Sequence, residues 1–147
     1  MSYSFKKRGF TLIEVLLVVV IIAILAGIVI IAVNPARQIA QTNNAQRDSD
    51  VRSILDAVHQ YAVDNRGALP AAITGEALMI GDASIDICTD LVPTYLAEMP
   101  FDPTYATGAY TDCTTYDSGY TIMEGADGRV TVAAPTAELS EIISVTR

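Results

Sequence analysis

Positive charge is scarce in this chain outside its first nine residues. The only two lysines, Lys6 and Lys7, precede Gly9, and beyond Gly9 six arginines oppose all 17 acidic residues, a net charge of −11. Residues 67–147 alone contain 12 acids and two arginines, a net charge of −10. Because a surface this acidic repels phosphate backbones, the composition argues against direct nucleic-acid binding by this part of the chain.

Histidine is equally rare, which limits the chemistry available. His59 is the only histidine, no cysteine lies at ligand spacing from it, and nothing around it indicates a Ser–His–Asp arrangement. We therefore expect no enzymatic activity and no cofactor. Three acids flank predicted strands near glycines, namely Asp112, Asp117 and Asp127. Since their spacing is not that of an EF-hand, solvated turn carboxylates are the favoured interpretation and a calcium site is the weaker hypothesis.

Only two cysteines occur, Cys88 and Cys113, and both lie in the second half of the chain. If that half is outside the cytoplasm, a disulfide is the natural interpretation, and two buried free thiols are the alternative. In the loop-entropy treatment, closing a loop of this size stabilises a fold by roughly 3–4 kcal/mol.

The chain contains one long apolar run, residues 10–33, in which Glu14 is the only charged residue. A helix of this length measures about 36 Å, enough to cross a hydrocarbon core of about 30 Å. Lys6, Lys7 and Arg8 precede the run, so the positive-inside rule places residues 1–9 in the cytoplasm and the rest outside. The run is too long for an ordinary secretory signal, and no A-x-A pattern closes it.

The pair Asn34-Pro35 interrupts the helical pattern after this run. Pro35 lacks an amide donor and disfavours helical geometry at Asn34, while Asn34 is a good cap for a helix that restarts at Pro35. Residues 36–65 then predict an amphipathic helix that stops at Asn65-Arg66-Gly67. Its apolar stripe consists of Val51, Ile54, Leu55, Val58, Tyr61 and Ala62.

Beyond residue 67 the pattern favours a small antiparallel sheet. Residues 118–124 and 129–135 alternate in polarity around a glycine-flanked turn, which is typical of a β-hairpin. Three further segments are expected: a strand over 108–116, a strand over 141–147 with a short helix over 137–142 as its rival, and a short helix over 87–96. The predicted fold class is α+β, with one long N-terminal helix, kinked near Asn34-Pro35, packed on this sheet. Five tyrosines are expected to pack that sheet with their hydroxyls at water: Tyr95, Tyr105, Tyr110, Tyr116 and Tyr120.

The start of the chain resembles the processing site of type IV pilin precursors and of the related pseudopilins, in the stretch KKRGFTLIEVLLVVVIIAIL. The resemblance covers residues 6–33 and implies the type IV pilin fold. It also implies cleavage between Gly9 and Phe10 by a membrane-embedded prepilin peptidase, which would methylate the new amine of Phe10. Subunits would then leave the cytoplasmic membrane, through an assembly platform with its ATPase, and pack their N-terminal helices into an extracellular filament.

Combined with this resemblance, the sequence predicts four segments. Residues 1–9 form a cleaved leader peptide, residues 10–33 the membrane and filament-core half of the N-terminal helix, residues 34–66 its amphipathic half, and residues 67–147 a globular α+β head.

Glu14 has two candidate partners. Within its own chain, the carboxylate lies about 6 Å along the helix axis from the amine that cleavage would create on Phe10, and near the helix N-terminus. In a filament, it would instead neutralise the Phe10 amine of a neighbouring subunit and set the axial register. The resemblance favours the second partner.

Three functions remain open at this point. The first is the structural subunit of a type IV pilus. The second is the major pseudopilin of a type II secretion system, because the stretch EMPFDPTYATGAY is similar to a proline-aspartate-proline stretch of that group. The third is an uncut, single-span membrane-anchored binding module.

The predicted bridge from Cys88 to Cys113 differs in position from that of many Gram-negative major pilins. It ends farther from the C-terminus than their bridged loop does.

Overall fold

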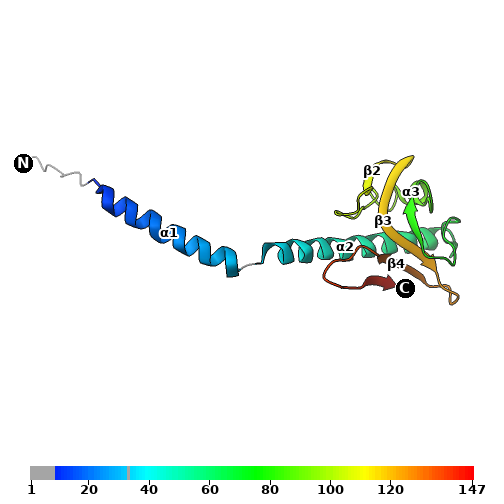
Figure 1. Cartoon of the computed structure of the whole chain (residues 1–147). Coiled ribbons are helices and arrows are strands. Elements are labelled where there is room, and N and C mark those ends of the chain that lie inside the picture. Colours follow the sequence, from blue (N-terminus) through cyan, green and yellow to red (C-terminus); the bar gives the residue numbers. More distant parts are fainter. Residues whose placement is uncertain (1–8, 33) are drawn as a thin grey trace, which may run out of the picture. The chain divides into compact units, whose positions relative to one another are not determined.

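The computed structural model describes residues 9–32 and 34–147 (Figure 1). The basic cluster at Lys6, Lys7 and Arg8 lies outside the described residues, as does Val33 at the predicted end of the apolar run. The chain divides into two compact units, Met1–Gln38 and Ile39–Arg147. Each unit is described by itself below.

The first unit is dominated by the apolar helix α1, Leu12–Ala32. Every α1 side chain that the structure describes is exposed. Its segment Leu12–Ile30 is long enough and apolar enough to cross a membrane. Exposed apolar surface of this size is unfavourable in water, so α1 needs to be covered by lipid or by other protein surface.

A second helix, α2, spans Pro35–Asp64. Asn34 caps it, since its side-chain Oδ1 accepts the amide of Arg37 at 3.2 Å and its carbonyl accepts the amide of Gln38 at 3.2 Å. Pro35 therefore occupies the first helical position, where its missing N–H costs nothing. The interruption between α1 and α2 falls at the residues that the sequence indicates.

The other end of α2 also follows its sequence signal. Arg66 and Gly67 adopt positive φ angles of 61° and 92°, and the amide of Gly67 donates to the carbonyl of Ala62 at 2.7 Å. This left-handed turn satisfies a carbonyl at the helix end and stops the helix. The observed end at Asp64 lies one residue from the predicted one.

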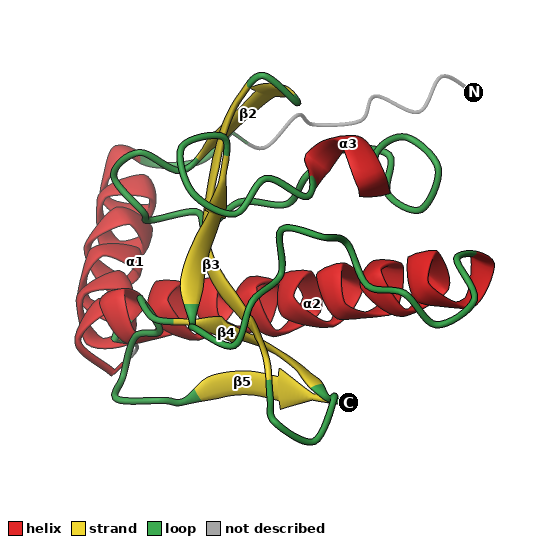
Figure 2. Cartoon of the chain, turned by 90° about the vertical axis from the view of Figure 1, so that its right-hand side faces the viewer, coloured by secondary structure: helices red, strands yellow, loops and turns green. Residues whose placement is uncertain are grey.

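The second unit contains a five-stranded antiparallel sheet in the order β1-β3-β4-β5, with β2 also paired to β3. The strands are β1 (Leu78–Gly81), β2 (Ala109–Asp112), β3 (Thr115–Glu124), β4 (Val130–Ala134) and β5 (Ile143–Thr146). The predicted hairpin is β3–β4, and the predicted strands near residues 108–116 and 141–147 are β2 and β5. Figure 2 shows the sheet with α2, whose buried side chains join those of β3 and β4 in one core.

Two expectations about local structure need correction, and one strand was not expected. Strand β1 carries no alternating signal and was not predicted. The helix expected over 87–96 shrinks to α3, Cys88–Leu91, because Pro93 follows and forces Val92 into an extended conformation. The rival helix over 137–142 does not form, since Leu139 and Ser140 adopt φ angles of 59° and 58°, outside the right-handed helical region.

The tyrosines of the sheet pack as expected, but two of their hydroxyls do not face water. Tyr116 and Tyr120 are buried, and each phenol donates to a carboxylate, that of Asp86 at 2.9 Å and that of Asp50 at 2.8 Å. Burial and the hydrogen bond to the carboxylate raise the pKa of both phenols. These two residues therefore belong to polar networks inside the fold, since a buried phenol needs a partner.

Candidate functional site

The N-terminal site is built on the first turn of α1. Phe10 precedes the helix and is 82% exposed. The amide of Thr11 donates to Oε2 of Glu14 at 3.4 Å, and the amide of Glu14 donates to Oγ1 of Thr11 at 3.3 Å. This reciprocal pair is a capping box, which satisfies two amides at the start of the helix.

The capping box adds a third role for Glu14 to the two considered from the sequence. Its signal, a threonine followed three residues later by a glutamate before an apolar run, is present in the stretch TLIE. Within one chain the carboxylate accepts a backbone amide, and Glu14 stays exposed to a second partner. The carboxylate is therefore held at the beginning of the helix, against the amide of Thr11.

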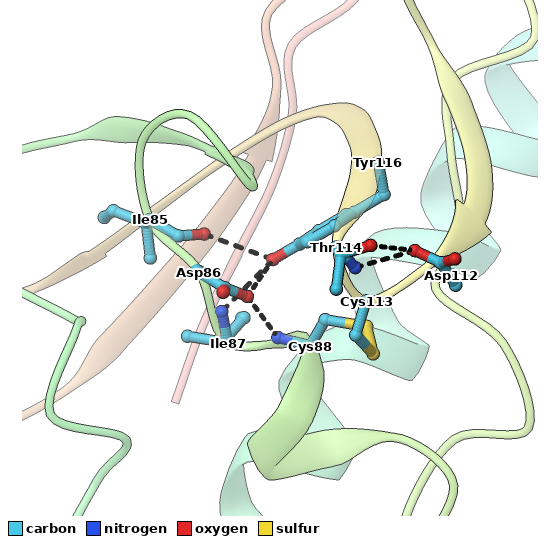
Figure 3. Close-up of a disulfide and its surroundings, with 8 residues drawn as sticks. All are labelled: Ile85, Asp86, Ile87, Cys88, Asp112, Cys113, Thr114 and Tyr116. Carbon is cyan, nitrogen blue, oxygen red and sulfur yellow. Dashed lines mark hydrogen bonds between the residues drawn. A yellow bond between two sulfur atoms is a disulfide. The ribbon is translucent and has the colours of Figure 1, made fainter.

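The disulfide joins Cys88 at the start of α3 to Cys113 in the turn between β2 and β3. Figure 3 shows its surroundings, in which the Tyr116 hydroxyl accepts the amide of Ile87 at 3.2 Å and donates to Asp86. Asp86 in turn accepts the amide of Cys88 at 3.2 Å. The disulfide and the hydrogen bond from Tyr116 to Asp86 therefore both hold the segment at the start of α3 to the β2–β3 hairpin.

The three acids considered as calcium ligands are not brought together. Asp112 closes its own turn by accepting the amide and hydroxyl of Thr114, which holds the pKa of its carboxyl below the usual value. Asp117 lies near the start of β3 and accepts the hydroxyl of Thr107 at 2.7 Å. Asp127 lies beyond the other end of β3, where it pairs with Arg129 at 3.5 Å. No group of three or more metal-binding side chains occurs among residues 9–32 and 34–147.

His59 lies in α2. Its Nε2 is the one buried side-chain polar atom without a hydrogen-bond partner in the described part of the chain.

The sequence did not indicate the buried ionic network between α2 and two loops. Arg47, whose side chain is fully buried, donates from Nε to Asp102 at 2.7 Å and from Nη2 to the second oxygen of the same carboxylate at 3.1 Å. It also pairs with Glu138 at 2.9 Å. Burial by itself raises the pKa of Asp102, but the hydrogen bonds from Arg47 and Thr136 outweigh it and lower that pKa to about 2.

Arg47 was missed because it occupies the apolar stripe of α2, four residues before Val51. A helical pattern marks such a position as buried, but it gives no partner for the charge. The only signal was indirect, because Asp102 lies in the proline-flanked stretch noted in the sequence. Three residues after Arg47, burial raises the pKa of the Asp50 carboxyl despite the hydrogen bond from Tyr120.

Comparison with known proteins bears on the N-terminal site. Residues 4–30 match the family model of the prokaryotic N-terminal methylation motif. Neither the curated proteins nor the solved structures gave a match to the chain. The matched stretch contains Gly9, Phe10 and Glu14, and such a motif implies processing by a prepilin peptidase and filament assembly in general. The methylation motif supports a type IV pilin or pseudopilin precursor, and the long apolar helix followed by a second helix and a small antiparallel sheet agrees with that arrangement.

Proposed function

We propose that this chain is the structural subunit of a type IV pilus. The observation that carries the proposal is α1, a membrane-length apolar helix that lies largely within the matched methylation motif and whose described side chains are all exposed. Lipid covers this helix before assembly, and the α1 helices of other copies cover it in the filament. The acidic second unit then forms the outer surface.

Processing creates the assembling form. The prepilin peptidase cuts between Gly9 and Phe10 and methylates the amine of Phe10. This removes the basic cluster at residues 6–8, which would otherwise hold the N-terminus in the cytoplasm. The exposure of Phe10 and its position before the first turn of α1 support this step, because the protease needs an unstructured bond. The subunit then enters an assembly platform driven by its ATPase.

Glu14 takes the Phe10 amine of a neighbouring subunit as its partner in the filament. In the lipid-like core, a charge without a partner costs several kcal/mol, roughly the penalty of leaving a buried ion unpaired. The pairing therefore selects the axial position at which the two charges meet. The capping box supports this role by holding the carboxylate at the start of α1.

The second candidate is the major pseudopilin of a type II secretion system. The observation in its favour is the proline-flanked Asp102, which anchors the network around Arg47 and therefore shapes this unit. A third candidate, an uncut membrane-anchored binding module, needs an intact leader.

Two measurements test the proposal. Mass spectrometry of the protein from its native cells should give a chain that begins at N-methylated Phe10, whereas a chain that begins at Met1 would support the uncut module. Electron microscopy with antibody against residues 39–147 should label long surface filaments. Processed protein confined to the cell envelope, with export lost when the gene is deleted, would favour the secretion pseudopilin.

A further inference from the structure

Strand β5 is the outermost strand of the sheet beyond β4 (Figure 2). Just past it, the amide of Arg147 donates to the carbonyl of Val130 at 3.0 Å, and its carbonyl accepts the amide of Val130 at 2.8 Å. Because only alternate pairs of an antiparallel ladder exchange such bonds, Ser144 and Thr146 direct their backbone amides and carbonyls away from β4. Both residues are exposed, and no other described segment pairs with this outer edge.

The edge at β5 is more regular than the edges at β1 and β2. The register of β1 and of β2 against β3 shifts within each strand, and the outer side of β1 bonds to Ile85. The register of β5 against β4 does not shift, and Ile143–Thr146 contains neither proline nor a charged residue. A regular, uncharged edge of unpaired amides and carbonyls is a template for a further strand. Its geometry therefore favours the binding of an extended peptide chain.

A groove of about 460 Å³ lies between this edge and α2, with walls formed by residues 41–52 and 141–144. Both ends of β5 are fastened to α2, because Glu141 accepts the side-chain amide of Asn44 at 2.9 Å and Arg147 pairs with Asp56. The helix rises about 18 Å between its two anchors, and the strand rises about 20 Å between its own. Strand and helix therefore run side by side in the same direction, so a chain added to β5 lies along the groove.

The charges of the groove indicate which kind of chain it binds. Glu141 is exposed and accepts the neutral amide of Asn44, but no cation of the described residues lies within ion-pair distance of its carboxylate. Arg52, the cation in the wall, is held at two points by Asp48 at 3.0 Å. The whole unit Ile39–Arg147 has 16 acids and five arginines, a net charge of −11. This field attracts a cationic chain and repels a second copy of the same unit.

We infer that β5 binds an extended, cationic segment of a partner protein as an added strand. The backbone of the segment pairs with the outward amides and carbonyls of Ser144 and Thr146. Its alternate side chains lie on the α2 side of the sheet, as Ile143 and Val145 of β5 do, where the unpaired carboxylate of Glu141 lies. Strand pairing gives the contact its geometry, and charge selects the partner. The contact belongs to the second unit, so it does not depend on whether the chain builds a pilus or a secretion pseudopilus.

Fluorescence anisotropy of labelled peptides, added to the full chain in neutral detergent micelles, tests this binding. The probe is a peptide of about eight residues in which lysine and valine alternate. Two control peptides of the same length alternate lysine with proline and glutamate with valine. Only the lysine–valine peptide should bind, because proline removes amides that pairing needs and glutamate is repelled. Added salt should weaken its binding, since screening reduces the attraction between exposed charges.

Ser144→Pro is the main variant, because it removes an outward amide and leaves the bonds between β4 and β5 in place. It should weaken binding of the lysine–valine peptide by about tenfold or more, and its matched control Ser144→Ala should bind as the wild type does. Glu141→Gln should bind more weakly and depend less on salt, since it removes the unpaired charge. In the wild type, bound peptide should slow hydrogen exchange at the amides of Ser144 and Thr146.

Four results would overturn the inference. Equal binding of the lysine–proline peptide, or of Ser144→Pro and the wild type, would show that charge alone attracts the probe. Equal binding of the glutamate–valine peptide would exclude a cationic partner. Unchanged exchange at Ser144 and Thr146 would exclude strand addition even if Ser144→Pro does not fold. Disulfide-linked dimers of Ser144→Cys in micelles without peptide would identify a second copy as the occupant of this edge.

Discussion

Arg47 and Asp102 form a two-point ion pair in the interior of the second unit, although 55 positions separate them in the chain. The pair ties α2 to the loop before β2, and through Glu138 to the loop before β5. One buried cation therefore links α2 to both loops.

Replacing Arg47 by methionine should destabilise the second unit strongly. The substitution leaves Asp102 buried without its cation, which costs about 3–5 kcal/mol in comparable buried pairs. Urea unfolding of the full chain in detergent micelles measures this change. The matched control is Arg52→Met, which breaks an exposed pair with Asp48 and should cost less than about 1 kcal/mol. If Arg47→Met and Arg52→Met have equal effects, the network has no special role in stability.

Stability should fall as the pH drops from about 4 toward 2. The pKa of Asp102 is lowered to about 2 in the folded chain, against about 3.9 for an unperturbed aspartate. The unfolded chain therefore binds more protons in this window, so the contribution of Asp102 is present above pH 4 and is lost through pH 2. The loss is on the order of 2 kcal/mol. Glu138, whose pKa is lowered by hydrogen bonds from Asn43 and Arg47, changes in the same direction.

The pH series is measured by urea unfolding of the full chain between pH 2 and pH 6. Asp102→Asn is the control, since it removes the titrating group and should flatten the slope in this window. Asp50 opposes the trend, because its raised pKa means that the folded chain holds a proton more tightly there than the unfolded chain does. A wild-type slope equal to that of Asp102→Asn would contradict the assignment.

Removing the disulfide should lower stability by about 3–4 kcal/mol in the loop-entropy treatment. The bridge closes a loop of sequence separation 25 between α3 and the β2–β3 turn. Cys88→Ala with Cys113→Ser, unfolded by urea beside the wild type, measures the difference. Tyr116→Phe is a companion variant, because it removes the hydrogen bond to Asp86 beside the bridge and keeps the covalent link. Equal stability of the wild type and the double variant would show that the polar contacts alone hold this loop.

Glu14→Ala should still be inserted and cut, but should fail to form filaments or should lack the methyl group on Phe10. The reason is the loss of the carboxylate that neutralises the neighbouring amine in the filament core. Mass spectrometry of the N-terminus and electron microscopy of the cells give the two readouts.

Thr11→Ala separates this role of Glu14 from capping. It removes one half of the capping box and leaves the carboxylate in place, and we expect it to form filaments. Loss of filaments in both variants would indicate that the cap, and not the intermolecular pair, is what assembly requires. Normal filaments from Glu14→Ala would exclude a register role for Glu14.

Features that depend on neighbouring residues could be predicted from the sequence. The apolar span, the cap at Asn34-Pro35, the end of α2 and the β3–β4 hairpin all follow from helical periodicity, from the missing donor of proline, or from alternation in a strand. The motif around Gly9, Phe10 and Glu14 is also local, and the family match covers that stretch. The errors lay where local signals are weak or conflict, in the short edge strand β1 and in the segment ended by Pro93.

The amino-acid sequence alone determined the α+β class, the membrane-length helix and the identity of the N-terminal motif. Only the tertiary structure decided where Arg47 finds its partners, why the hydroxyls of Tyr116 and Tyr120 turn inward, and which aliphatic side chains stay at the surface. A buried charge is tolerated only where acceptors from distant segments converge on it, as Asp102 and Glu138 converge on Arg47. That convergence is a product of long-range packing, and no local pattern in the sequence encodes it.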